Sequence, residues 1–385
     1  MCGIVGYIGD REAADFLMDG LAKLEYRGYD SAGIAVYNDG AIAVRKKAGR
    51  LVNLAEEVKA HPVVGTLGIG HTRWATHGGP SDVNAHPHTD EKGNFAIVHN
   101  GIIENYMELK EELLKKGYHF KSETDTEVVA HLCADMYDGD FTSTVRKVLS
   151  RLRGSYSLVF MCKFEPDKII CSKKDNPLIV GLGQGENYIA SDIPAILSYT
   201  RKTYIMNDGE IAIVMKDNVW VTDLEGKPIS KKVFEVNWDA EAAEKGGFEH
   251  FMLKEIYEQP KAIKDTMSCR ITKDGKHVHF EELNWTPEDV KSIGKILITA
   301  CGTAYHAGLL AKYFIEKLAR IPVEVDIASE YRYRDPLTDS KTLCIVISQS
   351  GETIDTLAAL KEAKRRGARS LAVTNVVGSS ISREA

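Results

Sequence analysis

The chain has 385 residues, of which 44% are hydrophobic and 27% charged, so it is predicted to be a soluble globular protein of two or three domains. Its net charge of −6 at pH 7 comes from interspersed charges without a long basic run, which argues against nucleic-acid binding. No window approaches 18 uninterrupted apolar residues, so no membrane-spanning helix is expected.

The first half of the chain is predicted to mix short strands with helices. The expected helices cover 13–24, 103–116 (ended by Gly117) and 124–134, with Ser122 and Thr124 as possible N-caps of the last. The expected strands cover 3–8, 32–37, 68–71, 95–99, 157–162, 168–171, 187–190 and 211–215. Many strands with few helices predict packed sheets flanked by helices, an α+β arrangement.

The composition changes near 238–248, where charged and small residues predominate and few large apolar side chains are available for burial. We predict a linker over 241–248, which separates a domain at 2–240 from a domain at 249–385. A short charged helix inside one domain is the alternative.

The second domain is predicted to alternate strands with helices after a first helix over 249–266. Strands are expected at 296–298, 323–327, 343–347 and 371–374, and helices at 305–318 and from Thr353 to Lys364. This βαβ series predicts a parallel sheet with right-handed crossovers. A parallel sheet needs both faces covered, and few strands precede Ala385, so we expect an incomplete domain with apolar surface exposed near 371–373.

The seven cysteines form no C-x-x-C pair, and their spacing fits neither a disulfide framework nor a zinc site. This favours a reducing, cytoplasmic location. The N-terminus lacks the positive region and apolar stretch of a signal peptide.

Cys2 lies directly after the initiator methionine and before Gly-Ile-Val-Gly. Removal of Met1 would leave a thiol and a free α-amine on one residue. An α-amine has a reference pKa of roughly 7.7–8.0 and can act as a base near neutral pH. This combination predicts an N-terminal nucleophile. The alternative is a small buried hydrophobe at the start of a strand.

Five further motifs accompany the N-terminal MCGIVG. They are YRGYDSAG (26–33), HTRWATHG (71–78), NAHPH (84–88), HNGIIEN (99–105) and SETDTE (122–127). Together they resemble the glutamine amidotransferase domain of the N-terminal-nucleophile class. They are most similar to the glutamine–fructose-6-phosphate aminotransferase family, and this likeness covers nearly the whole chain. The resemblance implies that 2–240 is a class II glutamine amidotransferase domain with the sandwich fold of N-terminal-nucleophile hydrolases.

Release of ammonia from glutamine is an acyl transfer that needs a nucleophile and a stabilised oxyanion. Asn100 offers a side-chain NH2, and Gly101 offers a backbone N–H that a substrate can approach closely. The pair is therefore a candidate oxyanion hole for attack by Cys2. A hairpin turn is the alternative for an Asn-Gly pair.

Two charged residues can hold the other end of glutamine. Arg73 offers a planar fork to its carboxylate, and Asp125 offers a carboxylate to its α-ammonium. The resemblance implies the same two roles. The alternatives are a surface arginine and a helix-capping aspartate. The resemblance further implies that Thr76 and His77 lie on a mobile loop that closes over glutamine, and that Trp74 gates ammonia movement, although tryptophan is more often a core residue.

His86 and His88 form an H-x-H pair, which is a possible metal-ligand pair. No carboxylate or cysteine stands at a supporting spacing, and the expected chemistry needs no metal. We therefore expect neither a metal nor a cofactor.

Residues 348–353, SQSGET, follow a predicted buried strand and open a helix. Free N–H groups and the positive end of a helix dipole favour a phosphate there. The motif lacks the lysine of a Walker loop, and simple N-capping is the alternative. It resembles the phosphosugar-binding loop of sugar isomerase domains. This resemblance implies a sugar-phosphate site formed by Thr303, Ser348, Gln349, Ser350 and Thr353.

Two nearby positions refine this resemblance. Ala304 stands where many family members have serine, which puts one minor sugar contact in doubt. Gly378-Ser379-Ser380 resembles the start of a further sugar-site loop. The resemblance thus implies that 249–385 is an incomplete sugar isomerase domain.

The family transfers ammonia from L-glutamine to fructose 6-phosphate, giving glucosamine 6-phosphate and glutamate for amino sugar biosynthesis. The resemblance implies this transferase activity, and a homodimer for the full-length protein. A second sugar isomerase subdomain and a C-terminal tail, which supply the isomerising residues, are not in this sequence. We therefore expect the chain alone to hydrolyse glutamine without forming amino sugar.

Two other functions remain open at this point. One is an amidotransferase of the same class with another acceptor, such as phosphoribosyl pyrophosphate, which would need paired acids in a loop after a strand. The other is a non-catalytic sugar-phosphate-sensing module. An intact Met1 in the purified protein would favour the second, because a blocked α-amine cannot act as the base.

Overall fold

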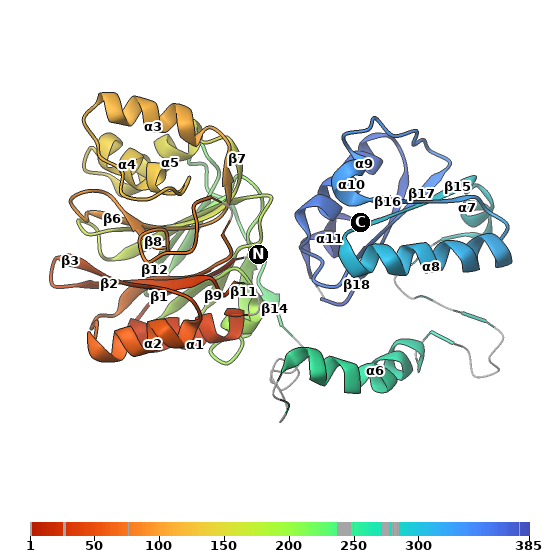
Figure 1. Cartoon of the computed structure of the whole chain (residues 1–385), viewed down its shortest axis with the longest axis horizontal. Helices are drawn as coiled ribbons and strands as arrows, with labels where there is room; N and C mark the ends of the chain where they lie inside the picture. The colour runs from red at the N-terminus through yellow and green to blue at the C-terminus, as the bar shows by residue number, and fades with distance from the viewer. Residues whose placement is uncertain are drawn as a thin grey trace. The chain divides into compact units, whose positions relative to one another are not determined.

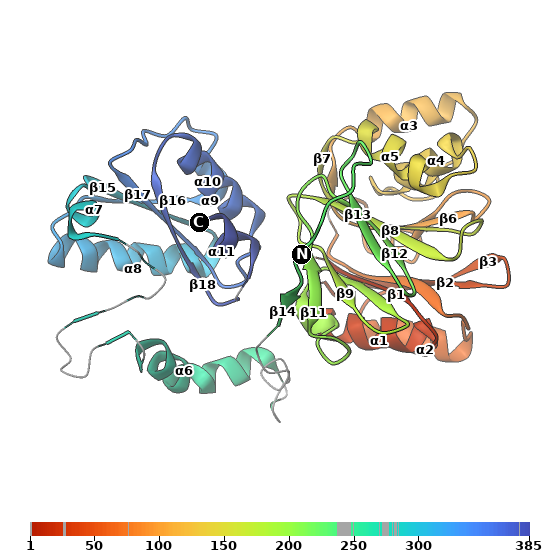
Figure 2. The same cartoon turned by 180° about the vertical axis from the view of Figure 1, so that it is seen from behind.

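The computed structural model describes all residues except 1, 26–27, 76, 237–247, 249, 269, 272–276, 279, 281–282, 284 and 377. It divides the chain into two compact units, 1–243 and 244–385, which are shown from two sides in Figure 1 and Figure 2. The linker predicted over 241–248 lies outside the described residues except for Phe248.

Two antiparallel sheets form the centre of the first unit. The larger has the order β14 (Phe234–Glu235), β11 (Lys202–Ile205), β9 (Ile179–Leu182), β10 (Asn187–Ala190), β1 (Gly3–Ile8), β4 (Leu67–Arg73), β2 (Ser31–Asn38) and β3 (Ala41–Ala48). The smaller has the order β13 (Val219–Thr222), β12 (Ile211–Met215), β8 (Lys168–Lys174), β7 (Gly154–Cys162), β6 (Phe95–Ile103) and β5 (His88–Thr89).

Helices cover the outer face of each sheet, which gives four layers (Figure 1). The larger sheet carries α1 (Ala13–Leu24), α2 (Leu51–Ala60) and the short 3-10 helix η2 (Ile193–Ala195). The smaller sheet carries α3 (Tyr106–Lys115), α4 (Glu127–Met136) and α5 (Phe141–Arg151). The α+β sandwich predicted from the sequence is confirmed.

Strand alternation builds these layers, because successive side chains point to opposite faces of a sheet. In β1, Val5 packs in the cluster with α1, whereas Ile4 packs between the two sheets. In β6, Val98 packs between the sheets, and Ile97 packs in the cluster that holds α3, α4 and α5. Both central strands are therefore buried on both faces.

The helix predicted over 124–134 begins later, at Glu127, with Thr126 in the N-cap position. The caps predicted at Ser122 and Thr124 are wrong, because both hydroxyls have other partners. Ser122 Oγ donates to Glu127 Oε2 at 2.6 Å, and Thr124 Oγ1 is 3.0 Å from His88 Nε2.

The helix predicted over 103–116 also begins later, at Tyr106. Ile103 still belongs to β6, because it pairs with Gly154 of β7. The sequence analysis did not predict α2 or α5. In α5, the Asp140 side chain caps the helix by accepting from Ser143 N at 3.0 Å.

The second unit contains a parallel sheet in the order β16 (Val323–Ile327), β15 (Lys295–Ala300), β17 (Thr342–Ser348) and β18 (Arg369–Thr374). Its helices are α6 (Phe251–Ser268), α7 (Pro287–Lys291), α8 (Gly302–Leu318), α9 (Ala328–Tyr331), α10 (Ile354–Arg365) and α11 (Ser380–Glu384). Residues of α8 pack on one face of the sheet, and residues of α9, α10 and α11 pack on the other. The predicted parallel βαβ sheet is confirmed.

Apolar side chains remain exposed in this unit. In the edge strand β18, Val373 is 52% exposed, as the sequence predicted, whereas Leu371 packs partly into the core. A larger group lies on α8, where Leu310, Tyr313, Phe314 and Leu318 are all exposed. No helix among the described residues is long and apolar enough to cross a membrane.

Candidate functional site

Cys2 lies where the start of β1 meets the end of β4. Gly3 pairs with Thr72 across these strands, so Cys2 comes opposite Arg73 and next to Trp74. Trp74 N donates to Cys2 Sγ at 3.2 Å, and Sγ lies 3.5 Å from Trp74 O. Gly3 permits this approach, because a Cβ there would lie 2.7 Å from both Leu24 Cβ and Thr72 Oγ1.

The surroundings of the thiol determine its protonation. Burial raises the pKa of the Cys2 thiol, and the hydrogen bond from Trp74 N lowers it by less. The thiol is therefore protonated at neutral pH in the resting site. A thiolate nucleophile would need a neighbouring base, which is the role predicted for the α-amine of Cys2.

Asn100 and Gly101 lie inside β6, paired with Ser157 and Tyr156 of β7, so the hairpin-turn alternative is wrong. Asn100 Nδ2 donates to the carbonyl oxygen of Cys2 at 3.1 Å. The structure thus brings the predicted oxyanion-hole amide into direct contact with the predicted nucleophilic residue.

Gly101 has a φ of +128°. A Cβ at this position would lie 2.1 Å from the carbonyl oxygen of Ser155 on the neighbouring strand. Both facts require glycine, since L-residues avoid this φ and the neighbour is backbone that cannot move aside.

We expect Gly101→Ala to lower the free energy of unfolding by at least about 2 kcal/mol, because it adds a backbone clash to an unfavourable φ. Urea denaturation measures this change. Gly93→Ala is the matched control, since Gly93 also has a positive φ (+63°) but open space around its Cβ position. Equal losses in the two variants would show that the clash is unimportant.

His71 fixes the orientation of the Asn100 side chain. Its Nε2 lies 2.9 Å from the carbonyl oxygen of His99 and 3.0 Å from Asn100 Oδ1. Both partners are acceptors in this arrangement, so Nε2 carries the proton. Burial lowers the pKa of His71 to about 3, which keeps the ring neutral. His71 lies in the HTRWATHG motif, from which this role was not predicted.

The rings of His86 and His88 pack in a cluster of histidine side chains. The His86 ring stacks on His71 at 4.2 Å between centroids and contacts His88 at 4.7 Å. Burial lowers the pKa of both His86 and His88 well below the usual value. Among the described residues, no group of three histidine, cysteine or acidic side chains is placed to hold a metal ion.

Arg73 is 3% exposed, so the surface-arginine alternative is wrong. Its guanidinium donates to the carbonyl oxygens of His77, Gly78 and Gly79, the last two at 2.8 and 3.4 Å. These bonds use three of the five guanidinium N–H groups, and a glutamine carboxylate that takes the same groups would have to replace carbonyl groups of the 77–79 loop.

Asp125 is buried and accepts a hydrogen bond from Ile103 N at 2.7 Å. Its carboxylate also lies 4.0 Å from His99 Nδ1. The helix-capping alternative is wrong, because α4 begins at Glu127 with Thr126 at its N-cap. The Asp125 carboxylate is instead hydrogen-bonded to β6 at Ile103, which lies two residues after Gly101.

The other predicted residues of this site differ in what the structure shows. Thr76 lies outside the described residues. The His77 ring contacts Tyr106 edge-on at 5.3 Å. Trp74 is 49% exposed and contacts Tyr29 edge-on, so it is not the core tryptophan that is the default expectation.

The predicted phosphate loop joins β17 to α10. Ser348 Oγ accepts from Gly351 N at 3.1 Å and lies 3.0 Å from Thr353 Oγ1. Thr353 occupies the N-cap position of α10 without a side-chain capping bond, so N-capping does not explain its hydroxyl. Gly351 has a φ of +64°, and a Cβ there would lie 2.0 Å from Ser379 Oγ.

Thr303 is exposed in the first turn of α8, directly after β15. The strand order reverses between β15 and β17, since the chain passes from β15 to β16 on one side and to β17 on the other. Ligands of open parallel sheets bind at the carboxyl ends of the strands at such a reversal. The topology therefore brings Thr303 and the 348–353 loop to one edge of the sheet.

The Gly378–Ser380 segment also reaches this loop. Glu352 Oε1 accepts from Ser380 N at 2.7 Å, and Gly351 O accepts from Ile381 N at 2.9 Å. The sequence analysis gave Glu352 no role. The structure shows that its carboxylate holds the start of α11 against the phosphate loop.

Comparisons with known proteins find matches in both parts of the chain. Residues 71–198 match the glutamine amidotransferase domain family, and residues 290–385 match the SIS domain family. Over 385 residues, the chain is 61% identical to the glutamine–fructose-6-phosphate aminotransferase [isomerizing] of Caldanaerobacter subterraneus subsp. tengcongensis.

Over its whole length the chain is similar to the glutamine–fructose-6-phosphate aminotransferases, and it contains regions of the two domain families named above. Relatives of the same name from Clostridium tetani and Thermus thermophilus are 60% and 54% identical. Each alignment covers 100% of this chain and 63% of the relative, so the chain spans less than two thirds of these aminotransferases.

Solved structures show a similar fold in other proteins. Glutamine phosphoribosylpyrophosphate amidotransferase from B. subtilis matches with a TM-score of 0.52 over 97% of this chain and 81% of that chain. The sequence identity is 19%, so this likeness concerns the fold alone.

One further residue beside Gly101 was not predicted from the sequence. Asn176 is buried, and its Nδ2 has no hydrogen-bond partner among the described residues. This atom lies 2.7 Å from the position that a Cβ of Gly101 would take. A buried amide donor without a partner is uncommon, and here it lies beside the predicted oxyanion hole. A single Asn after a strand carries no signal of this placement.

Proposed function

We propose that the first unit is a glutaminase that releases ammonia from L-glutamine. The observation that carries this proposal is the contact of Cys2 with both Trp74 N and the Asn100 amide. The α-amine of Cys2 takes the proton of the thiol, and the sulfur attacks the amide carbon of glutamine. The resulting oxyanion accepts hydrogen bonds from Asn100 Nδ2 and Gly101 N.

Collapse of the tetrahedral intermediate breaks the carbon–nitrogen bond and leaves a thioester on Cys2. The α-ammonium returns its proton to the leaving nitrogen, so ammonia departs uncharged. Water then attacks the thioester with the same amine as base and releases glutamate. The neutral ring of His71 supports both attacks, because it keeps the Asn100 amide turned toward Cys2.

We propose that Arg73 binds the carboxylate of glutamine and that Asp125 binds its α-ammonium. Thr76 and His77 belong to the loop that closes over the substrate, and Trp74 gates the movement of ammonia. Two observations support the assignment of Trp74. Its indole is exposed, and its backbone N–H donates a hydrogen bond to Cys2 Sγ.

We propose that the second unit binds the phosphate of fructose 6-phosphate at the edge of the parallel sheet where the strand order reverses, between β15 and β17. The residues assigned to this role are Thr303, Ser348, Gln349, Ser350 and Thr353. Support comes from the hydroxyl-rich loop at the N-terminus of α10, where backbone N–H groups favour a phosphate. The whole protein would then form glucosamine 6-phosphate and glutamate.

The proposed domain limits are 2–240 for the amidotransferase, 241–248 for the linker and 249–385 for the sugar isomerase part. The identity of 61% to a fructose-6-phosphate aminotransferase favours this acceptor over phosphoribosyl pyrophosphate. We further propose a cytoplasmic homodimer for the full-length protein. The free thiols of the described cysteines support a reducing location.

The 385-residue chain, given glutamine and fructose 6-phosphate, is expected to form glutamate without an equivalent amount of amino sugar. Phosphate contacts provide ground-state binding, which alone does not move protons between sugar carbons. Glutamate and glucosamine 6-phosphate should be measured separately in one reaction. Stoichiometric amino sugar would place the isomerising groups within this sequence, and absence of glutamate would contradict the glutaminase itself.

A further inference from the structure

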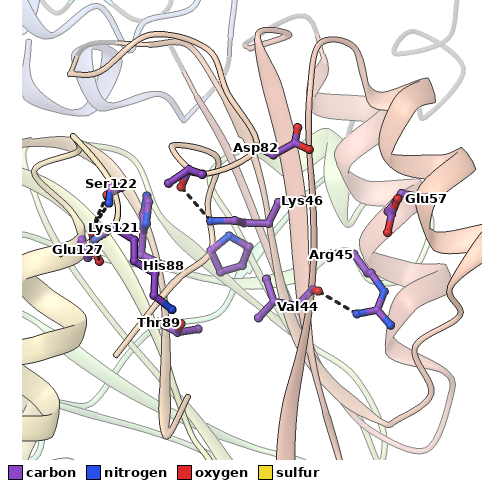
Figure 3. Close-up of a pocket in the computed structure, with 12 residues that line it drawn as sticks. Val44, Arg45, Lys46, Glu57, Asp82, His88, Thr89, Lys121, Ser122 and Glu127 are labelled. Atoms are coloured by element: carbon purple, nitrogen blue, oxygen red, sulfur yellow. Dashed lines mark hydrogen bonds between the residues drawn. The ribbon is translucent and has the colours of Figure 1, made fainter. Parts of the chain in front are cut away.

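A pocket of about 750 Å³ opens in the first unit between β3 and the start of α4 (Figure 3). Its described lining includes none of the residues proposed to bind or cleave glutamine. Its volume lies in the range of small-molecule sites. Part of its wall is apolar, formed by Val44, Val83 and Pro87.

Lys46 extends from β3 into this pocket toward His88 (Figure 3). Its ammonium donates to the carbonyl oxygen of Val83 at 3.0 Å, which uses one of three N–H groups. Burial lowers the pKa of Lys46 to about 8, because the charged form is poorly solvated there. No carboxylate among the described residues makes an ion pair with it.

The three carboxylates that line the pocket are engaged elsewhere. Asp82 accepts from Ala48 N at 2.7 Å and from Lys47 Nζ at 3.1 Å. Glu57 pairs with Lys47 at 3.6 Å and with His61 at 3.0 Å.

Glu127, the third carboxylate, is held by three hydrogen-bond donors and has His131 nearby. It accepts from Lys121 N at 2.9 Å, and from Ser122 N and Ser122 Oγ at 2.6 Å each. His131 Nε2 lies 3.5 Å away. The pocket therefore holds carboxylates that are bonded to other donors, beside three cations, Arg45, Lys46 and the exposed Lys121, that have no carboxylate partner in the described part of the chain.

We propose that this pocket binds a small organic anion whose carboxylate or phosphate group pairs with the ammonium of Lys46. The anionic group fills the space between Lys46, Lys121 and the Ser122–Glu127 corner. The apolar part of the ligand packs on Val83 and Pro87. An anion here supplies the charge that the buried ammonium lacks, as buried charges require.

The binding can be tested by calorimetric titration of the chain with benzoate and with phenyl phosphate, which share an apolar ring and differ in the anionic group. Both should bind saturably, and the tighter one identifies the preferred group. Benzamide, which lacks the charge, should bind at least about tenfold more weakly. Absence of saturable binding by both anions would overturn the proposal.

Lys46→Met keeps the length and apolar stem of the side chain and removes the charge. It should weaken the tighter anion at least about tenfold. Lys59→Met is the matched control, because Lys59 is an exposed lysine of α2 outside the pocket lining. Unchanged affinity in Lys46→Met would contradict the proposal, as would equal losses in both variants.

A second measurement does not depend on the variants. NMR of the lysine side chains should give Lys46 a titration midpoint near pH 8 in the free protein. The bound anion stabilises the ammonium form, so the midpoint should move upward when the tighter anion is added. An unmoved midpoint at a saturating concentration would place the anion elsewhere.

Discussion

Replacement of Cys2 by alanine is expected to abolish glutamine hydrolysis while the chain stays folded. Alanine keeps the backbone of the site but removes the sulfur that forms the thioester. We expect the rate to fall by a factor on the order of 10³ or more, as for removal of other catalytic nucleophiles. Glutamate release from glutamine alone measures this effect, and thermal unfolding checks the fold.

Two controls make this result specific. Cys162→Ala removes another thiol at the end of β7, away from β1, and should retain the glutaminase rate. The intact mass of the wild-type protein should lack the initiator methionine, because only then is the α-amine free. Hydrolysis at the parent rate by Cys2→Ala would refute the mechanism, and full activity in a protein that retains Met1 would refute the role of the amine.

Replacement of Arg73 by alanine is expected to weaken the use of glutamine strongly. The guanidinium is buried, and its loss leaves the substrate carboxylate without a charged partner. Such losses cost about 2–5 kcal/mol, which corresponds to a fall in kcat/KM of roughly 30-fold or more. Arg50→Ala is the matched control, because Arg50 is exposed and should change kcat/KM little.

Arg73 also holds the 77–79 loop, so a second substrate must separate binding from structure. γ-Aminobutyramide is glutamine without its α-carboxylate. The wild type should use it far less well than glutamine, and Arg73→Ala should discriminate little between the two. If the variant keeps the full preference for glutamine, another residue binds the carboxylate.

Much of the fold could be predicted because its strands and helices have regular apolar patterns. Gly3–Ile8 and Ala13–Leu24 were predicted with the limits that the structure shows. The strand Ala41–Ala48 was missed, since lysine and arginine side chains at an exposed edge hide its pattern. The start of α4 at Glu127 was missed because the Ser122 and Thr124 hydroxyls bond to the side chains of Glu127 and His88 and do not cap the helix.

The candidate site shows the same division. The proposed roles of Cys2, Asn100 and Gly101 follow from residue type and order, and the structure places the Asn100 amide against Cys2. Those of His71 and Asn176 could not be predicted, because they depend on contacts between strands that are far apart in sequence. The sequence also could not show that the Arg73 guanidinium is already bonded to backbone carbonyls.

In the proposed site, the carbonyl groups of His77, Gly78 and Gly79 compete with the carboxylate of glutamine for three of the five N–H groups of Arg73. A carboxylate that takes those N–H groups binds only in the fraction of molecules in which this loop has moved away. The apparent dissociation constant is then the intrinsic constant divided by that fraction. Substrate affinity is thus set partly by the stability of a substrate-free arrangement, and a change in the loop that never touches glutamine can tighten its binding.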